Sequence, residues 1–339
     1  MNHTAFFEQV KKGNIQPVYL MEGTEEYIKQ QALRQLCTKL LPAGLEELNL
    51  TDLTDPEADA LIAAAETLPF MADRRIVIIR ECSLLTAGKK AENEDKAAQI
   101  AEYVERIPPT ACVVFFVKGK ADGRKKLYTL LKKKNAIVDF SPMSDAECAD
   151  WARRTMARMG KQMTPRTADK LVFTVGRDAA LLKQEMEKLA AYLADRPEVT
   201  EADIDAICTR STECTVFQMV DAQVAGRNDV AFGLLKDMVR AGEDRIGILA
   251  MLLRQYRILY HMRSLMDERA PQQSQASLLG IPPFAVSRTQ QQARRYDRAR
   301  LKEAYESLLD YEQQIKGGLT PQEGCAENAL LRLEAILRA

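Results

Sequence analysis

Short apolar runs alternate with segments of helical periodicity over the first 140 residues of the chain. Apolar runs that are typical of strands buried on both faces of a parallel sheet lie at 17–21, 75–80 and 111–117. Amphipathic helix spacing is found at 25–41, 56–67 and 95–106. A weaker strand is expected at 45–50. This repeated order of strand, helix and strand predicts an α/β domain.

Strand signals nearly disappear after residue 143, and helix signals replace them. Ser144 and Glu147 form the pattern of a capping box, which predicts a helix that runs to residue 159. Further helices are expected to begin near residues 164, 181 and 200, and the chain is helical again from residue 216. Three domains are therefore predicted: an α/β domain at 1–140, a small helical domain at 141–210 and a larger helical domain at 211–339.

The composition is that of an ordinary globular protein. The 339 residues include 48 basic and 48 acidic side chains, and this balance argues against a uniformly basic coat for nucleic acid. No apolar run reaches the ~18 residues that would span a bilayer, and the N-terminus lacks the pattern of a signal peptide. Seven scattered cysteines form no CxxC pair, which favours reduced thiols. We expect a cytoplasmic protein without a membrane partner.

Few side chains are candidates for catalysis or metal binding. The only histidines are His3, which is expected in a frayed end, and His261, which lies in a segment of helical periodicity. A zinc site with histidine ligands or a Ser-His-Asp triad would have to use one of them. We therefore expect no catalytic residue and no metal site in this chain.

The turn after the first strand resembles a phosphate-binding loop in position but not in chemistry. A P-loop requires GxxxxGK[ST], so that backbone N–H groups and a lysine hold the phosphates and a hydroxyl binds magnesium. Here Gly23 is followed by no Gly-Lys pair, and Glu25 and Glu26 would repel a phosphate. We expect no nucleotide cofactor and no ATP hydrolysis. A divergent ATPase remains the alternative.

Apolar residues stand on the connection between the second helix and the strongest strand. Pro69 should end the helix near Thr67 and favour an extended Leu68. Connections normally lie at the surface, so Leu68, Phe70 and Met71 could be anchors for a partner protein. The alternative is that Phe70 folds back onto the core.

Two basic clusters interrupt the otherwise balanced charge. Residues 118–134 contain eight basic side chains and one acid, and residues 288–302 contain six basic side chains and one acid. Either cluster could contact phosphates, or could be a solvated helix face. A free-standing nucleic-acid-binding protein is therefore a further alternative.

Seven segments together resemble one protein family across nearly the whole chain. They are PVYLMEGTEEYI at 17–28, LPFMADRRIVI at 68–78, DGRKKL at 122–127, EMEKLAAY at 185–192, VF at 216–217, RQYR at 254–257 and IKGG at 315–318. In order and spacing they are similar to the delta subunit of the bacterial DNA polymerase III clamp loader, part of a nucleotidyltransferase complex. The resemblance implies an AAA+-like first domain without a working ATP site, a helical lid domain and a C-terminal helical collar.

The resemblance also implies the role of the apolar loop and the partners. Family members open the ring-shaped sliding clamp (beta) by inserting an apolar loop into a pocket on the clamp, which assigns the contact to Leu68, Phe70 and Met71. Met71 departs from the pattern, since other members have an aromatic residue or leucine there. The collar joins the motor subunits (tau/gamma) and delta-prime. Primer-template DNA lies inside the loader, and its candidate backbone contacts are Lys125, Lys126, Arg294, Arg295 and Lys316.

Overall fold

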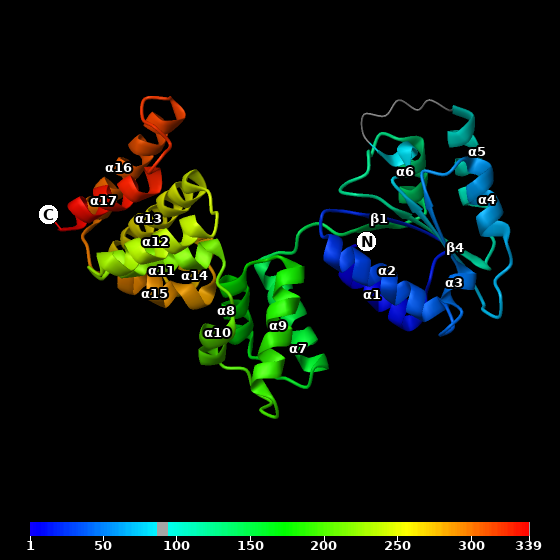
Figure 1. The fold of residues 1–339 in the computed structure, drawn as a ribbon, viewed down its shortest axis with the longest axis horizontal. Coiled ribbons are helices and arrows are strands. Elements are labelled where there is room, and N and C mark those ends of the chain that lie inside the picture. The colour runs from blue at the N-terminus through cyan, green and yellow to red at the C-terminus, as the bar shows by residue number, and fades with distance from the viewer. Residues whose placement is uncertain (87–93, 339) are drawn as a thin grey trace. The chain divides into compact units, whose positions relative to one another are not determined.

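The computed structural model describes residues 1–86 and 94–338. The chain divides into two compact units, Met1–Met143 and Ser144–Ala339. The first unit contains all the strands of the described residues, and the second unit is helical (Figure 1). The predicted fold class, α/β structure followed by all-α structure, is confirmed. The division of the second part at residue 210 stays a prediction.

The first unit is built on a five-stranded parallel sheet. Its spatial order is β2-β3-β4-β1-β5. The strands are β1 (Val18–Glu22), β2 (Leu50–Thr54), β3 (Arg75–Arg80), β4 (Ala111–Phe116) and β5 (Ile137–Asp139). Val113 pairs with Val18 on one side and with Val77 on the other, so β4 is central and buried along its length. The apolar runs of β1, β3 and β4 follow from this burial on both faces.

Helices cover both faces of the sheet (Figure 1). They are α1 (His3–Lys12), α2 (Glu26–Leu40), α3 (Glu46–Asn49), α4 (Ala58–Glu66), the 3₁₀ turn η1 (Ser83–Leu85), α5 (Glu94–Glu105) and α6 (Lys126–Lys133). Side chains of α4, α5 and α6 form one apolar core with alternate strand residues such as Val18 and Leu20. On the opposite face Phe6 of α1 packs edge-on against Tyr19 at 5.1 Å. Alternation along the strand sends Tyr19 to this second face.

Two predictions for the first unit are wrong. Residues 46–49 form α3, and the strand begins only at Leu50, because β2 is an edge strand with partly exposed residues and a weak apolar pattern. His3 is not in a frayed end. Asn2 caps α1 by accepting the Ala5 N–H at 3.0 Å, and the His3 ring stacks on Phe140 at 6.3 Å.

The second unit consists of eleven helices among the described residues. They are α7 (Asp145–Arg158), α8 (Pro165–Val175), α9 (Ala179–Leu193), α10 (Glu201–Ile207), α11 (Thr212–Val224), α12 (Asn228–Arg240), α13 (Arg245–Asp267), α14 (Gln272–Leu279), α15 (Pro283–Ala293), α16 (Arg298–Lys316) and α17 (Cys325–Arg338). The predicted capping box at Ser144 is confirmed. One apolar core extends through α11 to α17 and includes Leu252 and Tyr256.

Aromatic rings join the first helices of the second unit to the later ones. Phe173 of α8 packs edge-on against Phe217 of α11 at 5.4 Å and against Phe284 of α15 at 5.3 Å. None of the helices in the described part of the chain is long and apolar enough to cross a membrane.

Candidate functional site

The connection from α4 to β3 places large apolar side chains in solvent. Helix α4 ends at Glu66, and Pro69 cannot continue it. Leu68 is 76% exposed, Phe70 53% and Met71 77%. Phe70 is therefore not folded onto the core, which was the alternative left open by the sequence. We call residues 68–71 the apolar loop.

Polar side chains bond to the backbone of the apolar loop at Phe70 and to the residue that precedes the loop, Thr67. The side chain of Asn49, at the end of α3, is fully buried, and its Oδ1 accepts the Phe70 N–H at 2.7 Å. Its Nδ2 donates to the Phe70 carbonyl at 2.9 Å and to the Leu45 carbonyl at 3.0 Å. Near the base, the guanidinium of Arg75 donates to the Thr67 carbonyl at 3.2 Å. The loop is thus shaped by bonds to its backbone, which leaves its apolar side chains free for a partner.

Met71 sits at a strained point of the apolar loop. Its φ is 49°, in the left-handed region, where a residue with a Cβ costs about 1–2 kcal/mol relative to glycine. Such strain persists only where surrounding contacts fix the backbone, and the Asn49 bonds to the neighbouring Phe70 are such contacts.

The turn between β1 and α2 is closed by the protein's own carbonyl groups. The Gly23 N–H donates to the Gly119 carbonyl at 2.7 Å, and the Glu25 N–H donates to the Phe140 carbonyl at 2.9 Å. A Cβ on Gly23 would lie 2.3 Å from the carbonyl carbon of Phe140. These backbone donors, which a P-loop would direct at phosphate, already have acceptors.

A buried lysine completes the same turn. Lys29 of α2 is fully buried, and its ammonium donates to the Gly23 carbonyl at 2.8 Å and to the Val117 carbonyl at 2.9 Å. Glu26, which is half exposed, lies 2.5 Å from the same ammonium. The cation therefore ties the end of β1 to the end of β4. That the chain neither binds nor hydrolyses ATP stays a prediction.

The first basic cluster lies at and before α6. Lys125 is the N-cap of this helix and Lys126 its first residue. Lys126, Lys132 and Lys133 are exposed, and none of them has an acidic partner in the described part of the chain. Arg124 is different, because it pairs with Asp122 at 2.9 Å and its hydrogen bonds lower the pKa of that carboxyl to about 2. The lysines of α6 are thus available for a phosphate, whereas Arg124 is occupied.

The structure separates the other three candidate DNA contacts, which are Arg294, Arg295 and Lys316. Arg294 and Arg295 are exposed at the end of α15, without an ion pair among the described residues. Lys316 lies at the far end of α16, about 27 Å along the helix axis from its first residue. Lys316 also pairs with Glu312 at 3.0 Å. Arg294 and Arg295 therefore form one candidate contact, and Lys316 belongs to a different place.

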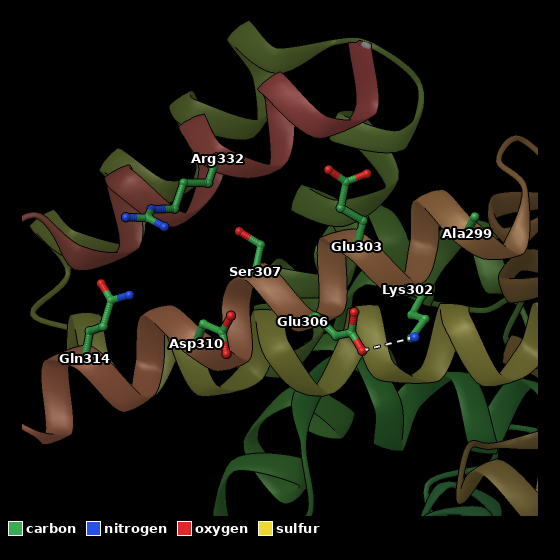
Figure 2. A pocket seen from close by; sticks show the side chains of 8 residues that line it. All are labelled: Ala299, Lys302, Glu303, Glu306, Ser307, Asp310, Gln314 and Arg332. Carbon is green, nitrogen blue, oxygen red and sulfur yellow. Dashed lines mark ion pairs between the residues drawn. The ribbon is translucent and has the colours of Figure 1, made fainter.

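Acidic side chains follow the second cluster along α16. A groove of about 430 Å³ is lined by residues of α16 and α17, among them Glu303, Glu306, Asp310 and Arg332 (Figure 2). Lys302 pairs with Glu306 at 3.4 Å. These carboxylates would repel a phosphate backbone beyond Lys302, and Arg288 at the start of the cluster already pairs with Asp221.

Six of the seven cysteines are buried, and Cys37 is partly buried. All seven cysteines are free thiols, and burial raises the pKa of the Cys112 thiol to about 12. A high pKa keeps the thiol protonated and unreactive. Within residues 1–86 and 94–338, no group of three or more His, Cys, Asp and Glu side chains could hold a metal ion.

The sequence did not indicate Leu48 or Asn49 as parts of the site. Leu48 is 56% exposed on α3, immediately before the residue that holds Phe70. Both lie in the segment 45–50, for which the sequence predicts a weak strand. No local pattern marks Asn49, because its partner is 21 positions away in the chain.

Comparisons with known proteins agree across both units. Residues 19–141 match the family model described as DNA polymerase III, delta subunit, and residues 213–333 match the one described as DNA polymerase III delta subunit, C-terminal domain. The chain is 28% identical to DNA polymerase III subunit delta of Bacillus subtilis over 331 residues, which are 96% of this chain and 95% of that protein. The solved DNA clamp loader delta protein of Bacillus subtilis matches with a TM-score of 0.58 and 26% identity, over 99% of this chain and 100% of that one.

Proposed function

The chain belongs to the family of DNA polymerase III delta subunits, and from this we propose that it binds a ring-shaped sliding clamp through Leu68, Phe70 and Met71 and holds the ring open for loading onto primed DNA. The observation that carries the proposal is the exposure of three large apolar side chains on one short loop. Apolar anchors that enter a pocket supply most of the free energy at many protein interfaces. The contribution of the chain is binding free energy, and no bond chemistry is assigned to it.

The partners follow from the same role. The helical second unit would join the motor subunits (tau/gamma) and delta-prime in the loader, and nucleotide bound by the motor subunits would control the assembly. Primer-template DNA would pass near Lys125 and Lys126 or near Arg294 and Arg295. The proposal includes a cytoplasmic location, which the seven free thiols support.

Clamp binding is tested with the full chain and its cognate clamp by surface plasmon resonance. The variant Leu68→Ala/Phe70→Ala/Met71→Ala should weaken binding by about 4 kcal/mol, or roughly 1,000-fold, if two of the three residues are hot spots of about 2 kcal/mol each. The control is Leu181→Ala/Leu319→Ala/Leu331→Ala, which removes three exposed leucines from the second unit. Equal affinities of the two triple variants would exclude the apolar loop as the contact.

Ring opening and DNA contact need separate measurements. A fluorescence donor and acceptor on the two sides of one clamp interface should move apart when the wild-type chain binds. In the assembled loader, Lys125→Ala/Lys126→Ala and Arg294→Ala/Arg295→Ala should each reduce the salt dependence of DNA binding by about one ion per lost phosphate contact. Tight DNA binding by the isolated chain would favour a free-standing nucleic-acid-binding protein instead, and ATP turnover by the isolated chain would favour a divergent ATPase.

A further inference from the structure

Four large apolar side chains are well exposed on the first unit, among the residues that the structure describes. Leu68, Phe70 and Met71 belong to the apolar loop, and Leu48 belongs to α3. Helix α3 and the loop are distant in sequence, but the Asn49 side chain bonds directly to the backbone of Phe70. Leu48 directly precedes Asn49, the residue whose side chain holds the loop.

The amide of Asn49 imitates the pairing of a neighbouring strand. It accepts the N–H and donates to the C=O of the same residue, Phe70, while its second N–H is used by the Leu45 carbonyl. Because Asn49 is fully buried, losing these bonds would leave polar groups without partners, which costs about 1–3 kcal/mol for each group. The pairing therefore favours the loop shape seen here, with Phe70 half exposed, over other shapes.

We propose that Asn49 is a positioning residue that fixes Phe70 in its binding conformation before the ring arrives, and that Leu48 is a fourth apolar contact to the same ring. This inference rests on the proposed function, since the occupant of the surface is the sliding clamp. Leu48 is assigned to that occupant because α3 is joined to the loop by the Asn49 bonds. The association and dissociation rates of clamp binding distinguish the two roles.

A positioning residue changes the population of the competent loop, whereas a contact residue changes the bound complex. If Asn49→Ala lowers the competent fraction to between about one tenth and one hundredth, the apparent Kd rises about 10- to 100-fold. The contacts of the complex stay the same, so the loss should be in the association rate, with a dissociation rate near that of the wild type. Leu48→Ala should instead raise the dissociation rate about 5-fold or more, as is usual for a contact residue at an interface.

The experiment measures both rates for full-length variants on the immobilised clamp. Asn14→Ala, at an exposed asparagine, is the control for Asn49→Ala, and Leu331→Ala, at a similarly exposed leucine, is the control for Leu48→Ala. Hydrogen exchange of β3 amides in each variant shows whether the first unit remains folded. A wild-type association rate for Asn49→Ala would overturn the positioning role, and a wild-type dissociation rate for Leu48→Ala would overturn the fourth contact.

A second measurement needs no clamp and separates this inference from the proposed function. In the free chain the Phe70 amide should exchange slowly, although the residue is half exposed, because Asn49 accepts its N–H. NMR should show that protection in the wild type and in Asn14→Ala, and its loss in Asn49→Ala. An unprotected Phe70 amide in the wild type would refute the positioning role whether or not the ring binds. A protected amide in a chain that fails to bind any ring would refute the proposed function alone.

Discussion

Replacing Lys29 by methionine tests the interpretation of the closed β1–α2 turn. Methionine keeps most of the apolar stem but removes the ammonium group. Two backbone acceptors would then lose this buried donor: the carbonyls of Gly23, at 2.8 Å, and Val117, at 2.9 Å. The ammonium also lies 5.0 Å from the centre of the Phe116 ring, a distance at which a cation is attracted to the ring.

The magnitude follows from these contacts. A buried acceptor left without a donor costs about 1–3 kcal/mol, so two of them cost about 2–6 kcal/mol. Part of this loss is offset, because the folded variant no longer buries a charge. We expect a net loss of about 2–4 kcal/mol in the free energy of unfolding of the first unit, which increases exchange from the folded state about 30- to 900-fold.

Hydrogen exchange measured by mass spectrometry reports this free energy for each unit in the intact chain. Peptides that cover β1 and β4 should exchange faster in Lys29→Met, and peptides from α13 should be unchanged. Lys39→Met is the matched control, since Lys39 is an exposed lysine on the same helix. An effect of Lys29→Met no larger than that of Lys39→Met would show that the buried ammonium does not stabilise the sheet, and the reasoning would fail.

Three further predictions concern the same unit. Gly23→Ala should destabilise the first unit far more than Gly13→Ala does. A Cβ at residue 23 would lie 2.3 Å from the Phe140 backbone, whereas Gly13 has open space around it. The exchange of β1 amides during urea unfolding would compare the stabilities of the two variants. The pKa of Asp122, about 2 in the folded chain, should rise toward its usual value of about 3.9 in Arg124→Gln. Because the pKa of Asp122 is lowered in the folded chain, its pairing with Arg124 stabilises the fold above the unfolded pKa, and this stabilisation is lost as the pH falls through about 2. A carboxyl NMR titration that gave the same Asp122 pKa in the wild type and in Arg124→Gln would contradict this prediction. Cys112, whose pKa burial raises to about 12, should react with a thiol reagent at pH 8 only after unfolding, and rapid labelling of the native chain at this residue would refute that burial.

Much of the architecture could be predicted because it depends on local pattern. The apolar runs that became β1, β3 and β4 are continuous since these strands are covered on both faces. The helix start at Ser144 was visible because a capping box needs only residues three positions apart. Edge elements were harder, and β2 and the three-residue β5 carry too few buried residues to give a signal.

The amino-acid sequence by itself determined the alternation of buried strands and helices in the first unit, the helical character of the second, the missing P-loop residues and the presence of apolar side chains after Pro69. Only the tertiary structure decided that Asn49 holds Phe70 and that Lys29 joins two strand ends, contacts that span 21 and 88 positions of the chain. The reason is physical. A polar side chain is usually solvated, so its burial depends on whether the folded chain brings it a hydrogen-bond partner, and no local pattern records that partner.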